Sequence, residues 1–126
     1  MRSGPAVREK FSRDDRLRKR REFEECYSAG ARVSGRHIQV FVLPEPDGSR
    51  SRLGLSAPRR VGNAVARNRV RRRLREIFRR NRSLLPGQPV RIVVNLRPSA
   101  AGASFEELSR DFLSTLARAL TRRTRA

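Results

Sequence analysis

Residues 59–82 have the sequence RRVGNAVARNRVRRRLREIFRRNR, which holds eleven arginines, one glycine, no proline and a single acid, Glu76. Apolar residues recur through this stretch at helical spacing and share one side of a helical wheel; they are Ala66, Val70, Leu74, Ile77 and Phe78. The pattern predicts a helix that starts after Asn63 as its N-cap and ends near Asn81. Its apolar side should lie on a sheet, and its arginines should face outward.

The arginine side of this helix predicts a polyanionic partner. The chain has 126 residues and a formal net charge of +19, and nearly all of its 31 basic residues are arginines. Arginine presents a planar fork of donors that matches phosphate oxygens and also stacks on bases. A solvated charged face would mix the two signs, whereas here Glu76 alone is available to pair with arginines three or four positions away. The chain is therefore expected to bind nucleic acid.

The composition excludes several other classes of protein. One cysteine, Cys26, and one histidine, His37, cannot supply a disulfide framework or a four-ligand zinc site. No apolar run is long enough to span a membrane, and the N-terminus lacks the apolar segment of a signal peptide, so a cytoplasmic location is expected. Ser56 lacks an adjacent histidine that could activate it as a nucleophile, and we expect no catalytic residues in the protein. With so few candidate ligands, we also expect no metal or cofactor bound by the protein alone.

The chain as a whole predicts one α+β domain. In chain order the expected elements are a helix over 14–28, strands over 33–43 and 52–57, the arginine-rich helix, a strand over 89–96 and a helix from Ser104 to about 121. This order corresponds to a two-layer sandwich with a sheet of three to four strands. The nucleic-acid-binding domain, residues 14–121, would lie between a flexible basic tail at 1–13 and a frayed basic end at 122–126.

Two features of the first half are more specific. Asp14 or Asp15 is expected to cap the first helix, with a later start near Arg21 as the alternative. The strands over 33–43 and 52–57 are expected to pair as a hairpin, because the intervening residues 44–49 contain two prolines and a glycine.

Three aromatic residues indicate a second binding surface. Phe23 and Tyr27 are four positions apart on the first predicted helix, and Phe41 lies on the following strand. If this helix packs beside the sheet, the three rings would line one concave side, with His37 nearby. Aromatic rings in such a position stack on unpaired bases. The alternative is that all three are ordinary core residues.

Several motifs occur in the order found in one known family. They are Arg21-Glu22-Phe23 with Tyr27, the strand from Arg36 to Phe41, Gly54-Leu55-Ser56, the run from Arg59 to Val65, Arg67-Asn68-Arg69 with its following arginines, and Leu96-Arg97-Pro98. From about Arg16 to Leu120 the chain resembles the bacterial ribonuclease P protein subunit, whose signature is the Arg-Asn-Arg core.

The chain departs from that family's usual pattern in the connector before the arginine-rich helix. Pro58 stands where a small polar residue is common. Arg59 and Arg60 replace a lysine pair, and such replacements alter bidentate contacts. The resemblance therefore implies RNA contacts at Arg59 and Arg60 but does not fix their details.

The resemblance implies a fold and a function. The fold would be ribosomal-protein-S5-domain-2-like, with a left-handed β-α-β crossover, although the general rule favours right-handed ones. The function would be to assist a catalytic RNA, whose holoenzyme uses Mg²⁺, in releasing the 5′ leader of precursor tRNA. Residues implied to contact the RNA subunit are Arg59, Arg60, Arg67, Asn68, Arg69, Arg71, Arg72, Arg75 and Arg97. Residues implied to bind the leader are Phe23, Tyr27 and Phe41.

Two other functions also fit the charge and the predicted elements. One is a ribosomal or other structural RNA-binding protein with no part in cleavage. The other is a DNA-compacting protein, which would prefer duplexes and would need no aromatic cleft.

Overall fold

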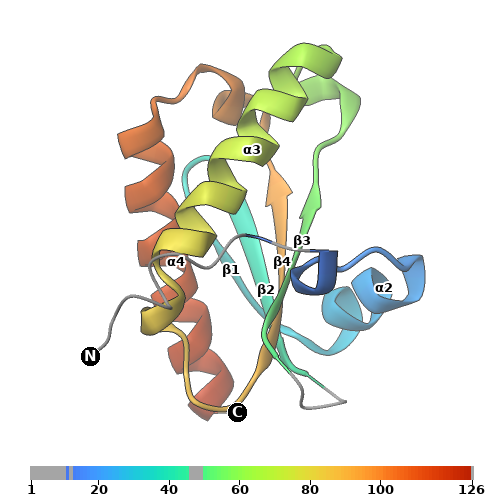
Figure 1. Ribbon diagram of the computed structural model, residues 1–126, viewed down its shortest axis with the longest axis vertical. Coiled ribbons are helices and arrows are strands. Elements are labelled where there is room, and N and C mark those ends of the chain that lie inside the picture. The colour runs from blue at the N-terminus through green and yellow to red at the C-terminus, as the bar shows by residue number, and fades with distance from the viewer. Residues whose placement is uncertain (1–10, 12, 46–49, 126) are drawn as a thin grey trace.

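The computed structural model describes residues 11, 13–45 and 50–125. Its elements in chain order are η1 (Arg13–Asp15), α2 (Arg20–Ala29), β1 (Ala31–Ser34), β2 (Ile38–Pro44), β3 (Arg52–Ser56), η2 (Arg59–Val61), α3 (Ala64–Arg80), η3 (Arg82–Leu84), β4 (Val90–Leu96), η4 (Pro98–Gly102) and α4 (Phe105–Arg125). The strands form one sheet in the order β1-β2-β4-β3, with α3 and α4 on one face and α2 on the other (Figure 1). The predicted α+β class is confirmed.

Strand β4 occupies the centre of the sheet. It is buried at every position except Asn95, as expected for a run of β-branched residues covered on both faces. It pairs antiparallel with β2 and parallel with β3. The predicted hairpin between β2 and β3 is therefore wrong, because β4 lies between these two strands. Residues 46–49 of the predicted turn lie outside the described residues.

The single strand predicted over 33–43 is two strands, β1 and β2, joined by a tight turn. The Gly35 amide donates to the carbonyl of Ile38 at 2.8 Å, and the Asp111 carboxylate accepts from the amides of Arg36 and His37. A Cβ atom at Gly35 would collide with Thr115 and Asp111 of α4, so this close approach requires glycine. The turn divides the predicted range and so gives the sheet its fourth strand.

The connection from β3 to β4 runs through α3. Both strands run upward in Figure 1 while α3 descends on the face away from α2, so the crossover is left-handed. Asn63 caps the helix as predicted, its Oδ1 accepting from the Ala66 amide at 2.9 Å. The predicted apolar side is buried at Val70, Leu74, Ile77 and Phe78. The helix ends at its C-cap, Asn81, as expected.

Helix α2 starts later than the main prediction. It begins at Arg20, which confirms the alternative, and Lys19 rather than Asp14 or Asp15 is its N-cap. Asp15 is instead buried, and it pairs with Arg50 at 2.9 Å and with Arg82 at 2.6 Å. The local sequence does not reveal this role, because the partners of Asp15 are more than thirty residues away.

The residues before α2 extend the sheet edge. Leu17 donates its amide to the carbonyl of Leu53 at 3.0 Å, so this segment lies along β3. Leu17 then joins Cys26, Phe41 and Val93 in a small core beneath α2. At the other end of the chain, Ser104 caps α4 as predicted, and this helix continues to Arg125, past the predicted end near 121.

Candidate RNA interface

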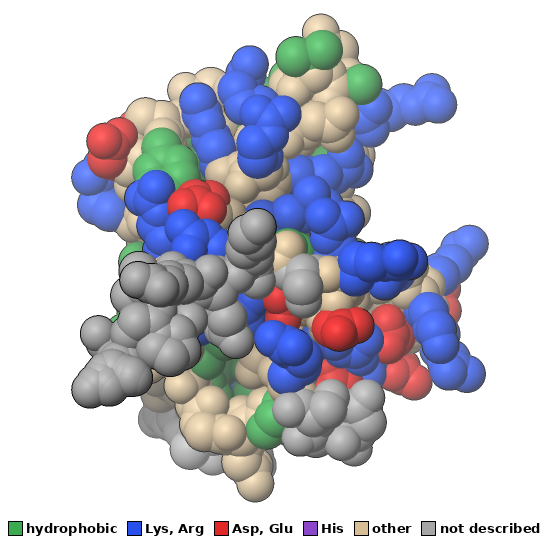
Figure 2. All heavy atoms as spheres, viewed as in Figure 1, with side chains coloured by type: hydrophobic (Ala, Val, Ile, Leu, Met, Phe, Trp, Pro, Cys, Tyr) green, Lys and Arg blue, Asp and Glu red, His purple; other side chains and the backbone are tan. Residues whose placement is uncertain are grey.

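The outward side of α3 presents a row of polar groups. Asn68 and Arg72 are exposed, and Arg71 donates to Asn68 Oδ1 at 2.9 Å. Figure 2 shows Lys and Arg side chains gathered over α3 and continuing toward α2. Because the opposite side of the helix is held in the core, these donors stand on a rigid support.

The arginines on the flanks of α3 are anchored to neighbouring loops. Arg67 donates to the carbonyl of Ala57 at 3.3 Å, Arg69 to that of Ala101 at 3.4 Å and Arg73 to that of Ala103 at 3.0 Å. Each guanidinium carries five N–H donors, so one such bond leaves others for a ligand. These contacts fix both the helix and the direction in which its arginines point.

Arg75 lies in a crowded cationic environment. Its guanidinium lies 5.9 Å from the centre of the Phe11 ring, and that of Arg16 lies 5.7 Å from the same ring. Burial, followed by the charges of Arg16 and Arg71, lowers the pKa of Arg75 from its ordinary value. Like charges held together by the fold favour an anionic ligand, which would relieve their repulsion.

Three further predicted contacts lie near the start of α3. Arg59 and Arg60 belong to η2, Arg97 directly precedes η4, and all three are exposed. These segments follow β3 and β4, which are parallel, so the carboxyl ends of both strands lie at the same end of the sheet. The fold therefore brings the three arginines to one end of the molecule.

The structure brings the predicted aromatic residues together between α2 and the sheet. The rings of Tyr27 and Phe41 meet edge to face with centroids 4.9 Å apart. Phe41 is buried, whereas Tyr27 is 40% exposed. Phe23 is half-buried and packs closely over Gly54, where a Cβ atom would lie 2.7 Å from its Cζ. Tyr27 is thus the ring most open to a ligand.

Asn95 is a member of this site that sequence analysis missed. Its Oδ1 accepts from the Tyr27 hydroxyl at 2.8 Å and fixes the orientation of that ring. The only sequence signal is a polar residue within an apolar strand. His37, which was expected near the aromatic residues, is buried, and its ring Nδ1 forms a hydrogen bond with the Ser99 hydroxyl at 2.8 Å.

A network of ion pairs holds α2 against the sheet. Glu45 lies at its centre and accepts from Arg52 at 2.9 Å and from Arg91 at 3.2 Å. These two arginines also bind Glu22 and Glu25 of α2, at 2.8 and 2.7 Å. Burial opposes ionisation of Glu22, but its interactions with Arg52 outweigh this effect and lower the pKa of the carboxyl. The network sets the position of α2 and hence of Tyr27.

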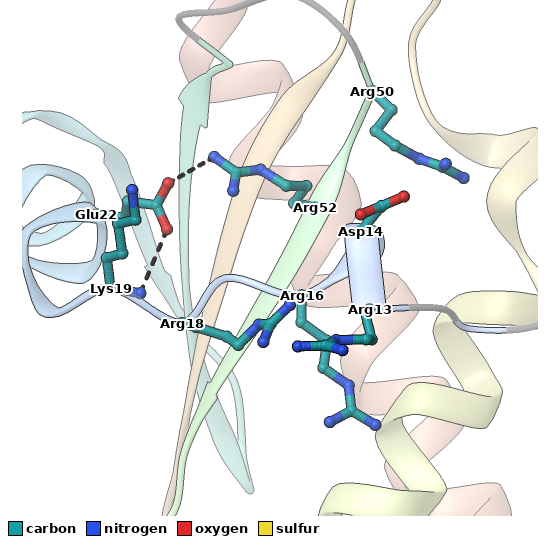
Figure 3. A pocket seen from close by; sticks show the side chains of 8 residues that line it. All are labelled: Arg13, Asp14, Arg16, Arg18, Lys19, Glu22, Arg50 and Arg52. Carbon is teal, nitrogen blue, oxygen red and sulfur yellow. Dashed lines mark hydrogen bonds and ion pairs between the residues drawn. The ribbon is translucent and has the colours of Figure 1, made fainter.

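A basic cavity continues this surface at the edge of the sheet. It has a volume of about 630 Å³ and is lined by Arg13, Asp14, Arg16, Arg18, Lys19, Glu22, Arg50 and Arg52 (Figure 3). Arg16 connects it to the α3 face through the ring of Phe11. The cationic surface therefore extends from α3 around the sheet edge.

Two kinds of feature are absent from the described part of the chain. Its residues contain no group of three or more histidine, cysteine or acidic side chains placed to hold a metal ion. None of its helices is long and apolar enough to cross a membrane.

Comparison with known families places most of this chain in one family. The family described as Ribonuclease P matches residues 11–120. The chain belongs to the ribonuclease P protein family. It is therefore a subunit of an endoribonuclease, and the family match favours this function over the ribosomal and DNA-compacting alternatives.

Relatives in this family cover most of the chain. The ribonuclease P protein component of Acidothermus cellulolyticus is 41% identical over 104 residues, which are 82% of this chain and 86% of the relative. That of a Nocardioides species is 44% identical over 105 residues, covering 82% and 89%.

Solved ribonuclease P proteins share the fold. The Staphylococcus aureus protein is 28% identical with a TM-score of 0.76, covering 83% of this chain and 94% of that one. The Thermotoga maritima protein is 32% identical with a TM-score of 0.73, covering 82% and 96%.

Proposed function

We propose that this ribonuclease P protein holds the RNA subunit through α3 and the 5′ leader of precursor tRNA through the aromatic site beside α2. Bond cleavage would be left to the RNA. The observation that carries the proposal is the pair of surfaces on one rigid domain, one made of arginines and one of aromatic rings. Each surface suits a different form of RNA.

The α3 surface suits a folded RNA. Successive residues of a helix rise by about 1.5 Å, so its side chains form a fixed array of donors that can match phosphates of a structured backbone. The proposed contacts are Arg59, Arg60, Arg67, Asn68, Arg69, Arg71, Arg72, Arg75 and Arg97. Binding through such contacts should weaken steeply as salt concentration rises.

The aromatic site suits a single strand. Unpaired bases can stack on exposed rings, and each stacked base contributes about 1–3 kcal/mol. Tyr27 offers the open ring, which Asn95 orients, while Phe23 and Phe41 support it from α2 and β2. We propose Phe23, Tyr27 and Phe41 as the leader-binding site, in which Tyr27 offers the stacking surface and the buried Phe41 holds that ring from below.

The chemistry is assigned to the RNA and the Mg²⁺ ions of the holoenzyme. Glu76 is the one acid within the arginine-rich helix, and hydrogen bonds from Arg79, with further help from Arg80, lower its pKa to about 2. A carboxylate of this kind stays ionised and paired at neutral pH, so it is unsuited to act as a general base. We propose no catalytic residue in the protein.

The direct test adds the purified protein to a ribonuclease P RNA at low magnesium and follows precursor-tRNA cleavage. We expect the protein to stimulate cleavage and to cleave nothing without the RNA. A protein that binds RNA without stimulating cleavage would support the structural RNA-binding alternative. Cleavage by the protein alone, free of contaminating nuclease, would contradict the assignment of chemistry to the RNA.

A further inference from the structure

A second cavity lies beside α3 and differs in character from the basic surface around it. It has a volume of about 550 Å³ and is lined by Phe11, Arg72, Arg73, Arg75, Glu76, Arg79, Arg80 and Phe105. Two aromatic rings and an acid are unusual on a surface that otherwise suits phosphates. A cavity that combines rings, arginines and an acid is suited to a ligand that is partly apolar and partly polar.

The two rings are half-buried and already lie close to guanidinium groups. Phe11 packs edge to face on Phe78, with centroids 5.7 Å apart. The guanidinium of Arg80 lies 5.3 Å from the centre of the Phe105 ring. Rings and guanidinium planes are the groups on which unpaired RNA bases stack.

Glu76 supplies the polar contact. Its carboxylate accepts hydrogen bonds from Arg79 at 2.9 and 2.6 Å and from Arg80 at 2.8 Å, the two shorter ones on Oε2. A carboxylate has about four acceptor positions, so Oε1 can accept one more hydrogen bond. A negative group here would repel a phosphate, but it would attract the amino group of a base.

We propose that this cavity binds one unpaired base of the RNA subunit that carries an amino group: adenine, cytosine or guanine. The base stacks on the ring of Phe105, and Glu76 accepts from its amino group. The exposed guanidinium of Arg72 lies at the same cavity and can bind the attached phosphate. This inference rests on the proposed function, since it requires that α3 face the RNA subunit.

The first experiment tests the ring. Phe105→Leu keeps apolar bulk but removes the stacking surface, whereas Phe105→Tyr keeps the ring. We expect the leucine variant to bind the RNA subunit about 5- to 100-fold more weakly and the tyrosine variant to bind like the wild type. Thermal unfolding of both variants separates loss of binding from loss of fold. Equal binding by all three proteins would overturn the proposal.

The second experiment asks whether Glu76 acts as a specific hydrogen-bond acceptor or only as a negative charge. Glu76→Gln removes a negative charge, which alone should strengthen binding to any RNA. The proposal predicts the opposite for the RNA subunit, together with unchanged or tighter binding to an unrelated duplex RNA. Glu24→Gln is the matched control, because Glu24 is also an acid paired with an arginine on its own helix. Tighter binding of the RNA subunit by Glu76→Gln would contradict the proposal.

The third experiment identifies the base. A photo-crosslinking amino acid at position 105 should label one unpaired nucleotide of the RNA subunit, and changing that nucleotide to uridine should weaken binding about tenfold. A crosslink confined to duplex regions or to the leader would overturn the proposal. Failure of the wild type to bind the RNA subunit would instead overturn the proposed function itself. Loss of binding in Arg72→Ala but not in Phe105→Leu would reject only the base site.

Discussion

Tyr27 combines an exposed ring with a fixed position. Its ring is 40% exposed, and yet it is held by a hydrogen bond to Asn95 and by the edge of Phe41. A ring that is already oriented loses little conformational freedom when a base stacks on it. This makes Tyr27 the residue on which leader affinity should depend most.

We therefore expect Tyr27→Ala to lower the affinity for precursor tRNA about 5- to 100-fold, because one stacking contact is lost. Tyr27→Phe keeps the ring and removes only the hydroxyl, so its effect should be much smaller. The measurement compares binding of precursor and mature tRNA to the holoenzyme, since only the precursor has a leader. An equal loss for both tRNAs would show that Tyr27 does not contact the leader.

Glu76 gives a pH-dependent contribution to stability. Its pKa is lowered from the ordinary 4.5 to about 2, so the unfolded chain binds more protons than the folded one between these values. The stabilisation is present above about pH 4.5 and is lost as the pH falls toward 2. We expect the difference in thermal midpoint between wild type and Glu76→Gln to shrink over this interval. A difference that stays constant from about pH 6 to about pH 2 would contradict this assignment.

Helix α3 acts as a unit because one side is buried and the other is an array of donors. If Arg71 and Arg72 each neutralise a phosphate, replacing either by alanine should make the log–log salt dependence shallower by about 0.7 to 0.9. Arg110, an exposed residue of α4, provides the control, and Arg110→Ala should leave the slope unchanged. The slope is obtained from RNA-subunit affinities at several salt concentrations. Equal slopes for all variants would place these arginines outside the interface.

The elements differ in how well their sequence predicts them. The limits and buried side of α3 follow from local spacing and from the Asn63 cap, so sequence analysis predicted them correctly. The predicted pairing of β3 with β2 was wrong. The true partner of β3, β4, lies far along the chain, and no local signal specifies which strand occupies the centre of the sheet. Asn95 and the Glu45 network were missed for the same reason. Their partners come from distant segments, and only the folded chain brings them together.

At the scale of the whole molecule, leader binding depends on how α2 docks on the sheet, because this helix carries two of the three aromatic residues. The network beneath it joins the sheet to this helix, with Glu45 between Arg52 and Arg91. The side chains of Glu45 and Arg91 are 1% and 4% exposed. Removing Glu45 leaves Arg91 with only Glu25, whose side chain is 48% exposed, and Arg52 with only Glu22, so these buried charges lose part of their compensation.

Glu45→Gln should therefore lower the free energy of unfolding by about 3 kcal/mol, because both Arg52 and Arg91 lose a charged partner. It should also loosen α2 and reduce leader affinity at least about fivefold, the effect of one lost stacking contact. Affinity for the RNA subunit should change little, since α3 packs on the opposite face of the sheet. Denaturant unfolding and the two binding measurements check this, with the exposed Glu24→Gln as control at about 0.5 kcal/mol or less. If both affinities fell equally, α2 and α3 would not be the separate binding surfaces proposed here.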